Sequence, residues 1–424
     1  MLLIIGMQIF MNNTQYSKYL FDKIKSLTSA NPGVTRETFG KGENLTHKFL
    51  IKELKQFSHS VEIDYGGNFL ALYKGKSKKI VVIGSHLDSQ KHGGNFDGLA
   101  GVLMGIILIK TLYENNIKPN FSIGVMGIRG EESCWFPYSY IGSKIAIGKF
   151  DKKLLHSLIR SDTKKSLFHH INKSGFDANK VSKGKVKFDL KNFKYFIEPH
   201  IEQGPILEKN KLPLGIVTSI RGSFRFRDAV CKGEYLHSGA TPIDYRKDSV
   251  VAVSSLVNEM NIYWQNQLKK RKDLTITFGQ FFTDFEEHSF AKSAGQVTFC
   301  IDVRSSSKAV LENTKKYLLG KVKKIELKTK TKFSLGKETS SEPAIMSKKL
   351  VRVFEDYSKS IKMKPMIMPS GAGHDSSVFA NFGIPSIMLF IRNKHGSHNP
   401  KEYMSIKNFM TVFDVLYGVI IKKL

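Results

Sequence analysis

Four short apolar runs in the first half of the chain predict buried β-strands. The sequence between the second and third of them, residues 98–116, is a long apolar segment that ends in polar residues and predicts a buried helix. Strands that alternate with helices favour a mostly parallel sheet covered by helices on both faces. The expected fold class is therefore α/β, with a mostly parallel mixed sheet. The four strand-like runs are FLALY (69–73), KIVVIGS (79–85), FSIGVMGI (121–128) and KYFIEPHI (194–201).

A middle stretch of the chain, residues 216–330, has a different character. Its strand-like alternations flank a helix-like segment at 248–270, which predicts a compact α+β unit inserted into the first domain. The chain then returns to α/β character, with a strand at 384–391 and a closing helix at 405–422. A length of 424 residues also favours two domains. The expected domains are residues 12–215 with 331–424, and the insertion 216–330.

The formal net charge of +29 raises the possibility of a polyanionic partner. The basic residues are mostly lysines scattered along the chain, and they accompany no basic helix, zinc finger or aromatic RNA-binding signature. A lysine-rich solvated surface is the favoured interpretation, and attraction of an anionic substrate is the alternative. The sequence predicts no nucleic-acid partner.

Cysteine content and the N-terminus bear on location. Three cysteines, an odd number at no metal-ligand spacing, suggest a reducing compartment, so a cytoplasmic location is expected. The first residues, MLLIIGMQIFMNN, are apolar but too short to span a bilayer, and they lack a positive region and a cleavage site. We interpret them as a ragged or misassigned start upstream of Met11, and we expect no membrane association.

Polar residues that could bind metal or transfer protons follow the predicted strands. Open α/β sheets bind their ligands at these strand ends. His86 and Asp88 stand two apart at the end of one strand, which suits a metal ligand oriented by a carboxylate. A lone histidine can equally be structural. Asp97 lies between glycines just before the apolar helix, where it could be a metal ligand, a helix N-cap or both.

Two adjacent glutamates, Glu131 and Glu132, follow the next strand. Neighbouring buried carboxylates repel each other unless a cation neutralises one, which suits a metal ligand beside a proton shuttle; an exposed acidic turn is the alternative. His200 and His398 follow two further strands. Imidazoles together with carboxylates form a ligand set that fits Zn, Mn, Co or Ni.

These motifs resemble a known family. Their order matches N-carbamoyl-L-amino-acid amidohydrolases and allantoate amidohydrolases, of the dinuclear metallo-aminoacylase and carboxypeptidase superfamily. The resemblance covers about residues 40 to 415, and peptidase relatives usually carry a carboxylate in place of His200. The matching motifs are GSHLDS, GGNFDG, GEES, HIEQGP, HSGATPIDYRKDS and GAGHDS followed by GSHNPKE.

The resemblance implies a phosphorylase/hydrolase-like catalytic domain that holds two divalent metal ions. One ion would be held by His86, Asp97 and His200, and the other by Asp97, Glu132 and His398, with Asp97 shared. Glu131 matches the general base that takes a proton from the attacking water and passes it to the leaving nitrogen. With Asp88 and His237 it completes the set of catalytic residues.

The inserted unit matches the family's lid and dimerisation domain, so a homodimer is expected. His237 there resembles a residue that stabilises the oxyanion, although a structural role in a turn is the alternative. Arg304 matches an arginine that binds the substrate carboxylate, and Gln203 matches a substrate-contacting amide. The loop containing Gly371 and Ala372 resembles one whose backbone approaches the substrate.

The implied reaction is hydrolysis of a C–N bond in a small linear ureido or carbamoyl carboxylate. The substrate would be an N-carbamoyl-L-amino acid, ureidopropionate, allantoate or ureidoglycolate. The chain departs from the family at Ala291, where many relatives carry Asn, and at Ser133, where many carry Gly; Lys292 could supply a compensating donor.

An aminoacylase or dipeptidase of the same superfamily is the main alternative. A binding protein that has lost catalysis is another, but the intact Glu131 and the full set of ligand positions oppose it.

Overall fold

The computed structural model describes residues 11–424, which form two compact units. The first comprises the chain up to Thr218 together with Ile345–Leu424, and the second is Ser219–Ala344. The second unit extends past residue 330 because β11 (Lys332–Ser334) and β12 (Glu338–Ser341) both pair with β7 (Gly222–Lys232). The expected ragged start, residues 1–10, lies outside the described residues.

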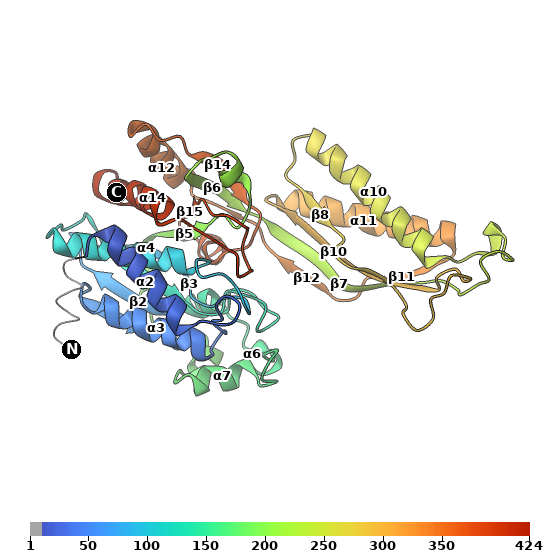
Figure 1. Ribbon diagram of the computed structural model, residues 1–424, viewed down its shortest axis with the longest axis horizontal. Helices are drawn as coiled ribbons and strands as arrows, with labels where there is room; N and C mark the ends of the chain where they lie inside the picture. The colour runs from blue at the N-terminus through green and yellow to red at the C-terminus, as the bar shows by residue number, and fades with distance from the viewer. Residues whose placement is uncertain (1–10) are drawn as a thin grey trace. The chain divides into compact units, whose positions relative to one another are not determined.

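A nine-stranded mixed sheet forms the centre of the first unit (Figure 1). Its order is β1-β2-β4-β3-β5-β15-β6-β13, with β14 paired to β6. The central strands β4, β3, β5 and β15 are parallel, whereas β2 runs antiparallel to β1 and β4, and β6 runs antiparallel to β15. The predicted α/β fold class is confirmed. The strands are β1 (Ser60–Ile63), β2 (Phe69–Tyr73), β3 (Ser77–His86), β4 (Phe121–Ile128), β5 (Phe193–Ile201), β6 (Leu214–Ile220), β13 (Ala344–Ile345), β14 (Met366–Ser370) and β15 (Ser386–Ile391).

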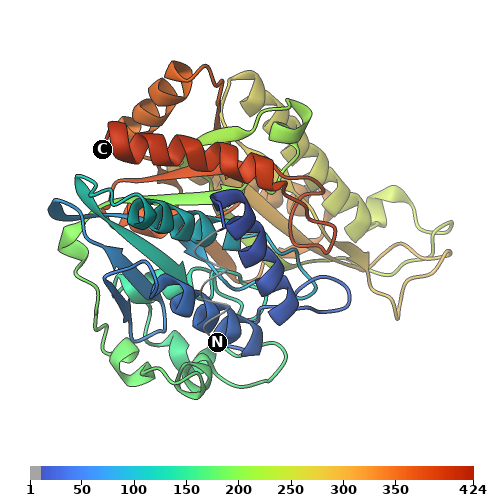
Figure 2. The same cartoon turned by 60° about the vertical axis from the view of Figure 1, so that its left-hand side comes forward.

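Helices cover both faces of this sheet, which explains why its central strands are apolar on both faces. One face packs against α2 (Asn13–Leu27), α3 (Lys41–Leu54), α4 (Leu99–Glu114), α12 (Lys348–Ser360) and α14 (Ile406–Lys422). Figure 2 shows α2, α4 and α14 together on that side. The other face packs against α5 (Ile141–Ala146) and α13 (Asp375–Asn381).

The remaining helices of the first unit are short. A separate apolar cluster that includes Phe136 and Leu167 lies among several of them. They are α6 (Leu154–Ser157), α7 (Leu167–Lys173), α8 (Ala178–Ser182), η1 (Leu190–Asn192) and α9 (Ile206–Lys209).

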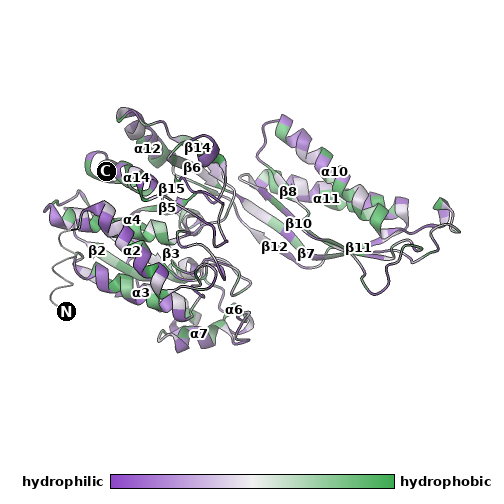
Figure 3. Cartoon of the chain, viewed as in Figure 1, coloured by the Kyte–Doolittle hydropathy of each residue, from purple (hydrophilic) through white to green (hydrophobic). Residues whose placement is uncertain are grey.

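The second unit is a six-stranded antiparallel sheet with two long helices, α10 (Ser249–Lys269) and α11 (Lys308–Thr329). Its strand order is β11-β7-β10-β8, with β12 on β7 and β9 on β10. Apolar residues of both helices and of the sheet form one core. Green and purple residues alternate along α10 in Figure 3, as expected of a helix with one buried face. The other elements are β8 (Thr275–Thr277), β9 (Phe281–Thr283), β10 (Gln296–Ser305) and η2 (Ile243–Tyr245).

No helix within residues 11–424 is long and apolar enough to cross a membrane. Even the apolar α4 has only 16 residues.

The close approach of α4 to the sheet generates a stability prediction. A Cβ on Gly101 would lie 2.2 Å from the Pro199 carbonyl oxygen and 2.8 Å from the Ser85 Cβ, so Gly101→Ala must push the helix from the sheet. We expect a loss of about 1–3 kcal/mol in unfolding free energy. Gly320→Ala in α11 is the control, because nothing lies within 4 Å of its Cβ and alanine favours helix by about 1 kcal/mol. Thermal unfolding followed by circular dichroism measures both, and equal effects would contradict the packing argument.

Candidate active site

The predicted ligands come from neighbouring strand ends and loops of the first unit. His86 is the last residue of β3, and His200 is the next-to-last residue of β5. Glu131 and Glu132 follow β4, whose parallel partner is β3. Because parallel neighbours end at the same edge of a sheet, these side chains start from adjacent positions.

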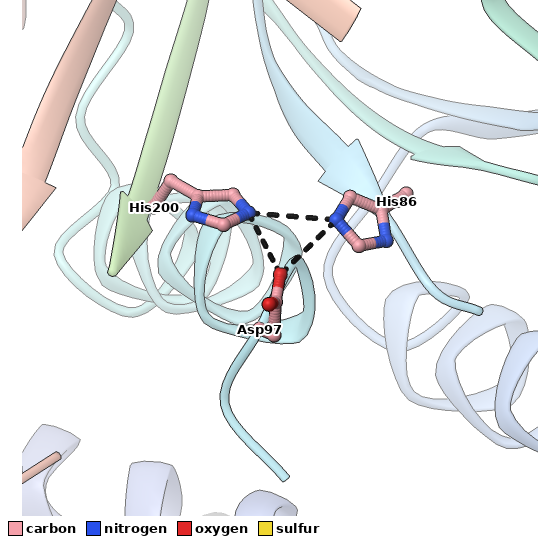
Figure 4. A group of neighbouring side chains, drawn as sticks. All are labelled: His86, Asp97 and His200. Atoms are coloured by element: carbon pink, nitrogen blue, oxygen red, sulfur yellow. Dashed lines mark hydrogen bonds and ion pairs between the residues drawn. The ribbon is translucent and has the colours of Figure 1, made fainter. Parts of the chain in front are cut away.

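Asp97 lies between two buried histidines. Its Oδ1 is 3.3 Å from His86 Nε2 and 3.1 Å from His200 Nε2, and the two imidazole nitrogens are 3.4 Å apart. The three side chains are at most 4% exposed. Figure 4 shows both rings pointing at the carboxylate from two strands, while Asp97 approaches from the start of α4. Three possible metal-ligand atoms, two imidazole nitrogens and one carboxylate oxygen, thus converge at one buried point.

The other oxygen of Asp97 belongs to a second group. His398 Nε2 is 3.4 Å from Asp97 Oδ2 and 3.1 Å from Glu132 Oε1. The side chain of His398 is 47% exposed, so this group borders on solvent whereas the first is enclosed. The structure therefore brings all five predicted ligands into two groups that share Asp97.

The ligand atoms of both groups fit divalent cations. Asp97 Oδ1 and Glu132 Oε1 are buried and accept no hydrogen bond from any residue in 11–424, although each faces imidazole nitrogen. A buried carboxylate oxygen without a donor costs free energy unless a cation compensates its charge. Imidazole nitrogens with carboxylate oxygens are the ligands that zinc and related divalent metals take.

The pKa values of the side chains in these two groups also show that positive charge is stabilised there. Burial alone would lower the pKa of His398, but Asp97 and Glu132 raise it to about 11. Burial would likewise lower the pKa of His86, yet the neighbouring carboxylates of Asp88 and Asp97 hold it well above the usual range. Burial would raise the pKa of Asp97, and the surrounding imidazoles hold it well below normal instead. The carboxylates thus create a field that stabilises cations.

Asp88 connects the end of β3 to the loop after β4. Its Oδ1 is 3.3 Å from His86 Nδ1, on the side of the ring away from Asp97. Its two oxygens also accept the backbone N–H groups of Glu131 at 3.1 Å and Glu132 at 3.2 Å. The Thr38 hydroxyl donates to the same carboxylate at 2.7 Å. Asp88 therefore orients one imidazole and fixes both glutamates at once.

Glu131 is a buried carboxylate, with 8% of the residue exposed. Burial raises its pKa well above the usual range, the charges of Glu132 and Asp375 add to this rise, and His86 opposes it. A raised pKa makes a carboxylate a stronger proton acceptor, as a general base requires.

Gln203, Gly371 and Ala372 also lie in the first unit. Gln203 adopts a left-handed backbone (φ 65°), and its Nε2 donates to Asp97 Oδ2 at 2.8 Å. The Gly371–Ala372 loop connects β14 to α13, and the Ala372 N–H donates to Ser370 Oγ. Ser370 Oγ also bonds His374 Nε2 at 3.0 Å, and the His374 ring lies 4.5 Å from that of His200. The loop predicted to contact substrate is thus joined to the His86–Asp97–His200 group through His374.

His237 and Arg304 belong to the second unit. His237 is exposed, and its Nδ1 accepts the N–H groups of Gly239 and Ala240 at 3.1 Å, so a neutral ring carries its proton on Nε2. Arg304 lies on β10 and its Nη2 donates to Asp302 Oδ2 at 2.8 Å. Lys292 Nζ lies 3.4 Å from Glu287 Oε2. The placement of these residues relative to Asp97 stays a prediction.

The N-cap interpretation of Asp97 is wrong. The N-cap of α4 is Gly98, with φ 65° and ψ −50°, and no side chain caps the helix. A Cβ on Gly98 would lie 2.5 Å from the His86 carbonyl oxygen, so glycine here lets the Asp97 segment pass close to β3. The Asp97 carboxylate is therefore free to face the histidines.

Several contributors to the site were not predicted. Most are side chains that bond the ligands or their backbone, and no periodic pattern marks them. Glu402 was quoted only within a motif, yet its Oε1 accepts the N–H groups of Phe96 and Asp97 at 2.8 and 3.2 Å. Gln90 donates to Glu132 Oε2 at 2.6 Å, and the Ser397 hydroxyl donates to Asp97 Oδ2. The unpredicted contributors are Arg36, Thr38, Gln90, His374, Ser397 and Glu402.

Comparisons with known proteins agree with this geometry. The model of peptidase family M20/M25/M40 matches residues 82–422. An N-carbamoyl-L-amino-acid amidohydrolase of Pseudomonas sp. (strain NS671) is 30% identical over 397 residues, 92% of this chain and 93% of the relative. The allantoate amidohydrolase of Bacillus subtilis (strain 168) is also 30% identical, over the same shares of both chains.

Solved structures lead to the same family. A hydantoinase/carbamoylase family amidase from Burkholderia multivorans superposes with a TM-score of 0.84 at 25% identity, covering 96% of this chain and 97% of the amidase. The resemblance found in the sequence motifs is thereby confirmed. The chain belongs to peptidase family M20/M25/M40, among the metal-dependent amidohydrolases that act on C–N bonds other than peptide bonds.

Proposed function

We propose that this protein hydrolyses a C–N bond of a small linear ureido or carbamoyl carboxylate with the help of two divalent cations. The observation that carries the proposal is the sharing of the Asp97 carboxylate between two groups of donors. His86 and His200 would complete one cation site, and Glu132 and His398 the other. Zn, Mn, Co and Ni all suit such donors.

When bound, the cations supply Lewis acidity, which lowers the pKa of water and polarises the substrate carbonyl. Glu131 provides the proton transfers: its carboxylate takes a proton from the attacking water and delivers it to the leaving nitrogen. Asp88 supports this step because it holds the Glu131 backbone and the His86 ring in a fixed relation.

A planar guanidinium binds a carboxylate through two parallel hydrogen bonds, so Arg304 would hold the substrate carboxylate. His237 would donate its Nε2 proton to the developing oxyanion. Gln203 and the Gly371–Ala372 backbone would contact the ureido or carbamoyl group.

The wider setting is proposed on the same basis. The protein acts in the cytoplasm as a homodimer that associates through the second unit, and its partner is a small carboxylate rather than a nucleic acid. The charge of +29 then serves to attract anionic substrates. Undetectable binding to duplex and single-stranded DNA at physiological salt is the expected result of a direct test.

A substrate panel tests the proposal. The metal-free protein is loaded with Mn, Zn, Co or Ni and offered N-carbamoyl-L-amino acids, ureidopropionate, allantoate and ureidoglycolate, with ammonia as the readout. Release from at least one of them is expected, because a carbamate product decomposes to ammonia and CO2. Turnover of dipeptides or acylated amino acids alone would instead identify an aminoacylase or dipeptidase.

Replacement of the proposed base separates chemistry from metal binding. Glu131→Gln should lower kcat about 10²–10⁴-fold, because an amide cannot accept the proton. Metal content should stay unchanged, since Glu131 is in neither donor group. Glu355→Gln, which removes a half-buried carboxylate paired with Lys359, is the matched control and should leave kcat unchanged. A parallel loss of bound metal in Glu131→Gln would make Glu131 a ligand and contradict its assignment as the base.

Metal binding should release protons at neutral pH. Asp97 and Glu132 raise the pKa of His398 to about 11, so its ring is protonated at pH 7, whereas a ligand nitrogen must be neutral. Affinity for Mn²⁺ should therefore rise with pH throughout the neutral range. Calorimetry at pH 7 in two buffers of different ionisation enthalpy counts the protons. His398→Ala should release fewer, and a heat of binding independent of buffer would refute the prediction.

A further inference from the structure

We propose that Arg36 is a positioning residue for the cation site, because its guanidinium fixes the loop that separates His86 from Asp97. This loop, residues 87–96, connects β3 to α4 and sets where the shared carboxylate lies relative to the histidines. The inference deepens the proposed function and rests on it. Neither the sequence motifs nor the family comparison assigns Arg36 a role.

The segment that carries Arg36 pairs with the loop along its length. Val34 and Gly93 exchange two backbone hydrogen bonds, of 3.0 and 2.9 Å. Two residues further on, the Arg36 N–H donates to Ser89 Oγ at 3.0 Å, and the Ser89 N–H donates to the Arg36 carbonyl at 2.9 Å. The backbone of Arg36 is therefore anchored to the loop independently of its side chain.

The guanidinium then reaches both ends of the loop. Its Nε donates to the Leu87 carbonyl at 2.8 Å, next to His86, and its Nη2 donates to the Asp97 carbonyl at 3.3 Å. Its Nη1 donates to Asn95 Oδ1 at 3.3 Å, and Asn95 is in turn bonded to the Phe21 carbonyl. Arg36 is fully buried. The rigid guanidinium of Arg36 thus sets the distance between the segments that carry His86 and Asp97, whose side chains must converge.

The charge of Arg36 has a separate effect from its geometry. Arg36 lies among the carboxylates of Glu402, Asp97, Asp88 and Glu132. A fixed cation near a site for divalent cations opposes their binding, because like charges repel in a buried environment. Its presence there is therefore explained by what it holds in place rather than by the charge that it brings.

These two effects predict opposite results for a neutral substitution. Arg36→Lys keeps the charge but loses the fork, and Arg36→Met loses both. If Arg36 acts by positioning, both variants weaken metal binding. If its charge dominates, Arg36→Met binds metal more tightly than the wild type, and Arg36→Lys resembles the wild type.

The test is a Co²⁺ titration of the metal-free full chain, followed by the visible absorption of the bound ion. We expect both Arg36 variants to bind Co²⁺ about 10–100-fold more weakly, with altered absorption bands, as is typical when a residue that orients ligands is removed. Lys110→Met is the matched control: Lys110 is a buried cation of the same unit that pairs with Glu114, and its loss should leave affinity and spectrum unchanged. Unchanged or tighter binding in Arg36→Met would overturn the inference.

A milder variant covers the case in which the Arg36 variants do not fold. Ser89→Ala removes only the hydroxyl that accepts the Arg36 N–H, and it should weaken Co²⁺ binding in the same direction by a few-fold. Unaltered affinity in Ser89→Ala, with no folded Arg36 variant, would also count against the inference. A wild-type chain that binds no Co²⁺ would reject the proposed function itself, and that outcome differs from wild-type binding that the variants leave intact.

Discussion

The carboxylate of Asp97 is the point on which the site depends. Its two oxygens face three imidazoles, and the carboxylates of Asp88, Glu131, Glu132 and Glu402 lie close by. Carboxylates at this density repel one another in a buried environment, and only positive charge among them makes the arrangement favourable. Arg36 and the imidazoles supply part of this positive charge, and a cation-binding role would explain the cost in stability that is left.

The fold meets this cost with backbone donors and a second layer of buried charges. Glu402 binds the N–H of Asp97, and Asp88 binds those of Glu131 and Glu132. Beyond them, Glu43 accepts the Gly130 N–H at 3.0 Å and pairs with Arg129 at 2.7 Å. The loops that carry Asp97, Glu131 and Glu132 are thus held through their main chain, which leaves these side chains free to face the centre.

The parts predictable from sequence were those that a local pattern marks. The apolar runs before His86, Glu131 and His200 identified strands, and their ends brought these residues together, as parallel topology requires. Arg36 and Thr38 carry no such mark, because their partners lie at least 50 positions away and their own segment forms neither helix nor strand. Polar residues in an irregular segment look like a surface loop until the tertiary structure buries them.

The division of the chain also separates two kinds of change. Every proposed cation ligand and the proposed base lie in the first unit, whereas Arg304, His237 and the departure at Ala291 lie in the second. The Ala291 carbonyl accepts the Ser238 N–H at 2.8 Å, a backbone bond that any side chain at 291 would allow. A substitution at 291 therefore leaves this backbone hydrogen bond of the second unit and the Asp97 network of the first unit unchanged.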